Sequence, residues 1–144
     1  DPLIRPILLN LQKLWGIDPS WFEAYRFWAN EHKLWLCSGA WQQVPQTRFV
    51  KTGLALAVRK SHFWKLTTAS AQWLGPQITR SLVELESEQL VQLLASGRLH
   101  CPGEALKYYV VTRKHRPIGV VSLSRGEMKL RIPHPFRLVR DADV

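Results

Sequence analysis

The sequence predicts an α+β protein in which a helix-and-strand part precedes a strand-rich part. An amphipathic helix pattern opens the chain, and β-branched runs separated by turn residues fill its last third. Of the 144 residues, 46% are apolar, which suffices for the core of one ordinary domain or two small ones. We place the division after residue 76, giving a domain of residues 1–76 and a domain of residues 77–144.

The first element is a helix over residues 3–15. Its apolar side chains recur at the i, i+3, i+4 and i+7 spacing of one helix face, and Gly16 follows as a stop. The Asp-Pro-Ser segment at 18–20 is an N-cap signal with proline at the first helical position, and Glu23 completes a capping box. We expect a short second helix that ends near Tyr25.

Strands and a third helix complete the first domain. Two apolar segments, Phe27-Trp28 and residues 34–37, surround a polar break and predict two short strands around a turn. Residues 42–47 form a polar loop, and residues 49–58 are rich in strand formers.

A helix signal ends this domain. Thr67 or Thr68 is a suitable N-cap, and Gly75-Pro76 stops the helix after residue 74.

The second domain begins with a short strand over residues 82–85. Ser87 is then the expected cap of a helix that Gly97 ends. Its expected apolar face consists of Leu90, Val91 and Leu94.

Three further strands form a small antiparallel meander. The β-branched runs 108–112 and 118–123 are joined by the basic link 113–117, and an Arg-Gly turn at 125–126 leads into residues 128–132. Pro133 and Pro135 end the pairing at an edge. We expect a half-closed barrel that carries one helix.

The charge is strongly positive and unevenly distributed. The net charge is +9. Residues 98–140 contain ten Lys or Arg but only two acids, Glu104 and Glu127. No acid lies between Glu31 and Glu84, where seven cations occur. One-signed surfaces favour polyanions through counterion release, so nucleic acid is the leading candidate partner. A merely soluble basic surface and an anionic membrane or acidic protein partner are the alternatives.

All tryptophans fall in the first domain. The seven are Trp15, Trp21, Trp28, Trp35, Trp41, Trp64 and Trp73. Aromatic residues among basic ones can be stacking platforms for unpaired bases. Because most of these tryptophans occupy periodic apolar positions, we expect them to pack in the core instead. Core packing is least expected for Trp41 and Trp64, because polar or basic residues flank them.

Sequence signals of catalysis or cofactor binding are weak. His100 and Cys101 are adjacent, but the histidines lack metal-ligand spacing, and no phosphate-binding glycine loop or nucleophile elbow is present. The alternating acids Glu84, Glu86 and Glu88 are better explained as helix caps. We therefore expect no metal, no cofactor and no enzyme.

The segment Leu36-Cys37-Ser38-Gly39 resembles the Pro-Cys-Ser-Gly nucleophile loop of RNA cytosine-5 methyltransferases. The preceding Asp-Ala-Pro is missing, so we assign Cys37 to a strand interior. With two cysteines in all, reduced thiols are expected.

The sequence shows no sign of export or membrane insertion. It has no apolar run of spanning length and no secretion signal, so we expect a cytoplasmic protein. Because the chain begins at Asp1 rather than a methionine, a piece of a longer protein is one interpretation, and a chain that stands alone is the other.

Two regions resemble a known family. The run "GLALA" with Lys60 and Phe63, and then "RSLVELESEQLVQLLASGRL" and "YYVVTRKHRPIGVVSLSRGEMKLRIP", resemble the PUA-like C-terminal region of bacterial rRNA cytosine-5 methyltransferases of the Nop/Sun type. The resemblance covers about residues 48–138. Pro117-Ile118-Gly119 and Met128-Lys129 match the family's closing hairpin, whereas residues 130–132 depart from it.

The resemblance implies a PUA-like mixed pseudobarrel that binds structured RNA, preceded by a small accessory domain. It implies an RNA-binding module acting on rRNA in ribosome biogenesis or RNA modification, without catalysis of its own. The partners would be RNA and a methyltransferase domain or ribosome-assembly protein. The chain would be a fragment or relative of an rRNA methyltransferase that lacks the catalytic domain.

The expected RNA contacts are basic side chains of the meander, extended by cations of the first domain. They are Lys129, Arg131, Arg125, Arg113, Lys114, Arg116, Arg59, Lys60 and Lys65. Strand alternation places Lys129 and Arg131 on one face and Met128 on the other. The alternatives are a protein-interaction module whose basic face docks an acidic partner, and an enzyme with an unrecognised site.

Overall fold

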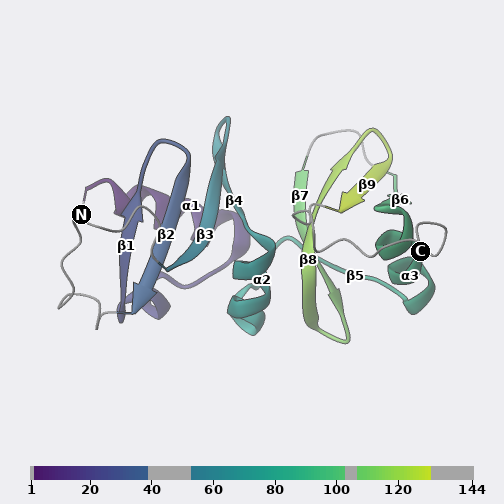
Figure 1. The fold of residues 1–144 in the computed structure, drawn as a ribbon, viewed down its shortest axis with the longest axis horizontal. Coiled ribbons are helices and arrows are strands. Elements are labelled where there is room, and N and C mark those ends of the chain that lie inside the picture. The colour runs from purple at the N-terminus through teal and green to yellow at the C-terminus, as the bar shows by residue number, and fades with distance from the viewer. Residues whose placement is uncertain (1, 39–52, 103–106, 131–144) are drawn as a thin grey trace, which may run out of the picture. The chain divides into compact units, whose positions relative to one another are not determined.

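The computed structural model describes residues 2–38, 53–102 and 107–130. They form two compact units, Asp1–Arg80 and Ser81–Val144, each with its own sheet (Figure 1). The division follows Arg80, four residues beyond the position that the sequence indicated. The backbone N–H groups of Thr79 and Arg80 both donate to the carbonyl of Trp15, at 3.0 and 3.1 Å, and so attach this segment to the first unit.

Helix α1 spans Ile4–Trp15, as the periodicity predicts. Its buried stripe includes Ile7 and Leu11, and Gly16 ends it in the left-handed conformation with φ of 66°. The Gly16 N–H donates to the carbonyl of Gln12 and closes the last turn.

The second predicted helix is a single 3-10 turn, η1, at Pro19–Phe22. The Asp18 carboxylate caps it by accepting from the Ser20 N–H at 2.9 Å. The expected extension to Tyr25 is wrong, because Tyr25 already begins a strand and is paired with Ser38.

The first sheet is antiparallel, with four strands in the order β1-β2-β3-β4. The strands are β1 Tyr25–Ala29, β2 Lys33–Ser38, β3 Leu54–Lys60 and β4 Phe63–Leu66. The two strands predicted around the turn are confirmed as β1 and β2. Strand β3 runs two residues past the predicted end, and β4 was not predicted. The loop predicted over residues 42–47 lies outside the described residues.

Helix α2, Thr68–Leu74, follows β4 and has the predicted Thr67 cap. The Thr67 hydroxyl accepts from the Ser70 N–H at 3.0 Å and donates to the carbonyl of Ala55 at 2.7 Å. The Ser70 hydroxyl donates to the Leu56 carbonyl at 2.7 Å. These bonds fix the start of α2 along β3, and the 3-10 turn η4, Gly75–Gln77, ends it.

The second unit holds a mixed sheet with strand order β5-β7-β8-β9-β6. Its elements are β5 Leu82–Glu84, α3 Ser87–Ser96, β6 Arg98–His100, β7 Lys107–Arg113, β8 Arg116–Ser124 and β9 Glu127–Leu130. The antiparallel meander is confirmed for β7, β8 and β9. Strand β5 adds a parallel edge beside β7, and the unpredicted β6 adds an antiparallel edge beside β9.

The α+β class is therefore confirmed, whereas among the described strands the sheet of the second unit does not close into a barrel. Strands β5 and β6 form its two edges and do not pair with each other. Pro133 and Pro135 lie outside the described residues.

Helix α3 differs from its prediction at the cap and on its buried face. Glu86, not Ser87, is the N-cap, and its N–H donates to the Gln89 side chain at 3.0 Å in a capping box. Leu93 is fully buried, whereas Val91, expected on the apolar face, is 65% exposed. The extended conformation of Glu86 starts the helix at Ser87, and burial of Leu93 beneath it leaves Val91 on the outer side.

The core of the second unit lies between α3 and one face of the sheet. Its buried members are Leu85, Leu93, Leu99, Val111, Val121 and Met128. Leu93 comes from α3 and Leu99 from the β6 edge, and Val83 of the β5 edge packs against the cluster. Both edges of the sheet therefore contribute to this core.

The described tryptophans divide between core and surface. Trp15 is 1% exposed and donates its indole N–H to the Trp64 carbonyl at 3.0 Å. Trp73 is 41% exposed and contacts both Trp21 and Tyr25 edge-on. Core packing is thus confirmed for Trp15 and wrong for Trp73. None of the described helices is long and apolar enough to cross a membrane.

Candidate nucleic-acid interface

Lys129 lies on β9 where alternation placed it. The side chain is exposed, and the preceding Met128 is fully buried in the core on the other face. Arg98 on β6 and Ser122 on β8 are its cross-strand partners, so Arg98 and Lys129 form a pair of neighbouring cations. Arg131 lies outside the described residues.

Glu127 compensates part of this positive charge. Its Oε1 lies 3.4 Å from Arg98 Nε and 3.9 Å from Lys129 Nζ. That oxygen atom is buried and has no hydrogen-bond partner among the described residues, so its polar contacts are the ion pairs with Arg98 and Lys129. The local balance is two cations and one anion, and both cations remain accessible to solvent.

The β7–β8 turn presents Lys114 at an exposed tip. Lys114 and His115 have φ values of 51° and 63°, the paired positive values of a tight two-residue hairpin turn. The Glu84 carboxylate accepts from the His115 N–H at 2.8 Å and from the Thr112 hydroxyl at 3.3 Å. The turn that carries Lys114 is therefore held in place by β5.

Arg113 contacts the protein itself. Its guanidinium donates to the Leu85 carbonyl at 3.3 Å and lies 3.8 Å from the Glu86 carboxylate. The side chain is 28% exposed. Arg113 thus links the hairpin to the start of α3, and a phosphate would have to compete with Glu86 for it.

Arg113 and Arg116 lie on the opposite face from Lys129. They are cross-strand partners, and a bulge at the Val111/Thr112 step changes the alternation along β8. The contact of Arg113 with Leu85, a core residue, shows that this pair points to the face that α3 covers.

Arg125 lies at the far end of β8. It forms a two-residue turn with Gly126, with φ values of 52° and 74°. Strand β8 has nine residues, so this turn and the Lys114 turn are about 27 Å apart at the usual rise per residue. The predicted meander cations therefore form separate groups and do not form one continuous track.

The first unit also separates its predicted cations. Arg59 pairs with Trp64, whereas Lys60 pairs with Phe63 and Lys65 pairs with Val58. Alternation puts Lys60 and Lys65 on one face of the sheet and Arg59 on the other.

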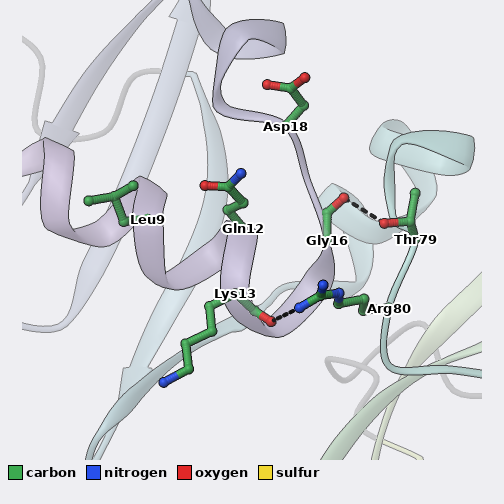
Figure 2. Close-up of a pocket in the computed structure, with 7 residues that line it drawn as sticks. All are labelled: Leu9, Gln12, Lys13, Gly16, Asp18, Thr79 and Arg80. Atoms are coloured by element: carbon green, nitrogen blue, oxygen red, sulfur yellow. Dashed lines mark hydrogen bonds between the residues drawn. The ribbon is translucent and has the colours of Figure 1, made fainter.

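A polar recess that sequence reasoning missed lies beside α1 (Figure 2). It has a volume of about 470 Å³ and is lined by Leu9, Gln12, Lys13, Gly16, Asp18, Thr79 and Arg80. Arg80 donates to the Lys13 carbonyl at 3.2 Å, and the Thr79 hydroxyl donates to the Gly16 carbonyl at 2.7 Å. Both bonds satisfy carbonyl groups at the end of α1. One wall of the recess is therefore the segment Thr79-Arg80, where the chain leaves the unit.

Two titratable groups of the first unit have a shifted pKa. The Ser20 N–H and hydroxyl lower the pKa of Asp18, which acts as a helix cap. Burial raises the pKa of the Cys37 thiol, and the positive charge of Arg26 opposes this in part. Cys37 lies in the interior of β2, as expected. Within the described ranges, no group of three or more acidic, His or Cys side chains is placed to hold a metal ion.

Comparison with known proteins assigns no family. No protein-family model matches the chain, and no curated protein matches it.

Proposed function

We propose that the protein is an RNA-binding module, without catalytic activity of its own, that acts on rRNA in ribosome biogenesis or RNA modification. The observation that carries the proposal is the exposed pair Arg98 and Lys129, within a segment, residues 98–140, that carries ten basic side chains and two acids. Lys114, Arg116 and Arg125 extend the contacts at the two hairpin turns. Arg131 belongs to the same proposal through its sequence position.

The proposed fold of the second unit is PUA-like. The support is the order β5-α3-β6 followed by the meander, with a parallel edge and an antiparallel edge. The proposed place of action is the cytoplasm, beside an RNA-modifying or ribosome-assembly protein.

Lys129→Glu combined with Arg131→Glu tests the RNA contacts. Binding of a structured rRNA fragment to the full chain is measured by fluorescence anisotropy over a salt series. Each phosphate contact that is lost on a duplex reduces the magnitude of the slope of log K against log salt by about 0.9. We therefore expect weaker binding and a shallower slope. Arg5→Glu, which reverses one charge at an exposed position of α1, is the control for each of the two reversals.

Glu127→Gln is expected to strengthen binding, because it removes the anion that compensates Arg98 and Lys129. The amide has nearly the shape of the carboxylate, and exposed ion pairs contribute only about 0–1 kcal/mol, so stability should change little. The expected result is a higher affinity and a steeper salt dependence in the same anisotropy assay. Unchanged affinity would show that these cations do not contact the RNA.

The competing function, docking of an acidic protein, predicts a different result. A wild-type chain that does not bind rRNA fragments but retains a stoichiometric acidic protein in a pull-down would replace the RNA proposal. Binding of rRNA that does not change between ordinary and high salt would also contradict it.

A further inference from the structure

The two faces of the first sheet differ in burial and in chemistry. Register and alternation put Leu34, Leu36, Ala57 and Leu66 on one face, where all are at most 2% exposed. Tyr25 lies on this same face and contacts Trp73 of α2. Helix α1, which lies behind the sheet in Figure 1, has a buried stripe of its own and contacts both edge strands, β1 and β4. Both described helices of the unit therefore pack on this face.

The opposite face, here called the Trp28 face, carries aromatic and basic side chains. Its members are Arg26, Trp28, Lys33, Trp35, Cys37, Ala55, Val58, Lys60, Phe63 and Lys65. None of the described helices of this unit covers it. Trp28, Trp35 and Phe63 are half-buried, which leaves part of each ring accessible.

A bulge in β3 creates this segregation. Leu34 pairs with Ala57 and Trp35 pairs with Ala55, so Leu56 is the extra residue. Leu56 and Ala57 are both fully buried, as expected when a bulge turns two successive side chains to one side. Beyond the bulge the alternation resumes with Val58 and Lys60 on the Trp28 face.

Two of the aromatic side chains form a short row across β1 and β2. Trp28 and Trp35 are directly opposite each other on β1 and β2. Side chains of such pairs lie about 5 Å apart, so the two indoles are neighbours on the surface of the sheet.

Cations surround this row. Lys33 and Lys65 are both cross-strand partners of Val58, about 10 Å apart at two strand spacings, and Lys60 lies two residues further along β3. Arg26, paired with Cys37, lies on the opposite side of the row from Lys33. The four strands contain no acidic residue.

We propose that the Trp28 face binds single-stranded nucleic acid, with bases stacked on Trp28 and Trp35 and phosphates held by Arg26, Lys33 and Lys60. A sheet face with exposed aromatic rings and one-signed positive charge fits unpaired bases, whose faces are accessible and whose backbone is anionic. An acidic protein would use the cations but not the paired indoles. The proposal stands apart from the RNA contacts of the second unit, because it uses other residues and a ligand without secondary structure.

The test uses the full chain with fluorescein-labelled ten-nucleotide strands, oligo(U) and oligo(dT). Anisotropy should show binding of both, since stacking and backbone contacts do not require the 2′-hydroxyl. Trp35→Leu should weaken binding at least about fivefold, the lower end of the loss of one stacked base. Lys33→Glu with Lys60→Glu should weaken it further and reduce the salt slope by about 1.4, since each single-strand contact contributes about 0.7.

Two controls keep the proposal falsifiable. Arg5→Glu makes one such charge reversal on α1, on the helix side of the sheet, and should leave oligonucleotide affinity within about twofold. Because Trp35 is half-buried, circular dichroism and thermal unfolding report whether Trp35→Leu folds, and the lysine variant, at one exposed and one half-buried position, tests the face independently.

Two results would overturn the proposal. One is an absence of binding to either strand at low salt. The other has two parts: unlabelled poly-glutamate displaces the labelled strand as effectively as unlabelled oligonucleotides do, and neither variant weakens binding. This result would indicate an acidic protein as the ligand of the face. If Lys129→Glu abolishes rRNA binding but leaves oligonucleotide binding intact, the function proposed for the second unit is supported and the Trp28 face is unaffected. If Trp35→Leu and the lysine variant leave oligonucleotide binding intact, the proposal for the Trp28 face is wrong, whereas the function proposed for the second unit is unaffected.

Discussion

Gly16 is the residue on which the end of the first unit depends. Its φ of 66° is left-handed, and an added Cβ would collide with the Thr79 side chain and come within 3.1 Å of the Arg80 N. The backbone N–H groups of those two residues donate to the Trp15 carbonyl, and both residues line the recess of Figure 2. A helix stop predicted from sequence thus also provides space for a segment more than sixty residues later in the chain.

Gly16→Ala is expected to lower the free energy of unfolding by about 2–5 kcal/mol. About 1–2 kcal/mol comes from the left-handed backbone, and overpacking adds a further 1–3 kcal/mol. Urea denaturation followed by far-UV circular dichroism, which reports on both units, measures the change. Gly97→Ala is the matched control, since Gly97 has φ of 74° but no atom within 4 Å of an added Cβ, and it should cost only the backbone part. Equal losses would show that the close approach to Thr79 does not matter.

Cys37 is expected to be the less reactive of the two thiols. Burial raises the pKa of its thiol above the ordinary value of 9.0, and the side chain is 6% exposed, whereas Cys101 is half-buried. Because only the thiolate attacks alkylating reagents, its iodoacetamide reaction should be slow at neutral pH and begin to rise only at a higher pH than for a free thiol. Mass spectrometry after timed alkylation should show modification of Cys101 first, and urea should abolish the difference. Preferential labelling of Cys37 in the folded protein would contradict this.

At the scale of elements, signals local in sequence were predictable. Helix α1 has both its period and its glycine stop, and α2 has its threonine cap, within the segments themselves. Strand β6 has no such signal, because Arg98–His100 is a strand only through its pairing with β9. The parallel pairing of β5 with β7 likewise depends on residues more than twenty positions apart, which no local pattern encodes.

The corrected face of α3 gives a direct test. Leu93 is fully buried among Val111, Val121 and Met128, so Leu93→Ala should destabilise the second unit by about 2–5 kcal/mol. Val91 is 65% exposed, so Val91→Ala should change the free energy of unfolding by less than about 0.5 kcal/mol. Urea denaturation with circular dichroism compares the two. Comparable losses of unfolding free energy in the two variants would show that Val91 points into the core, as the sequence predicts.

At the scale of the whole molecule, the sequence located the charge but not its arrangement. Counting cations identified the basic segments, yet neighbours in sequence such as Arg59 and Lys60 point to opposite faces. Bulges at Leu56 and in the β7–β8 pair shift the alternation, and only the strand register reveals them. The row formed by Trp28 and Trp35 was missed for the same reason, since periodic apolar positions indicate a core and do not show that helices cover only one face.

The two proposed binding faces, one in each unit, predict a crossed pattern of defects. Trp35→Leu should weaken short single strands while leaving a structured rRNA fragment nearly unchanged, and Lys129→Glu should do the opposite. Since the two residues belong to different compact units, their effects on any one ligand should add within about 0.5 kcal/mol in the double variant. Anisotropy with four proteins and two ligands measures all eight affinities at one salt concentration, which keeps the electrostatic part comparable. If both substitutions weaken both ligands in equal proportion, the chain binds nucleic acid through one shared surface, and the assignment of a separate face to each unit is wrong.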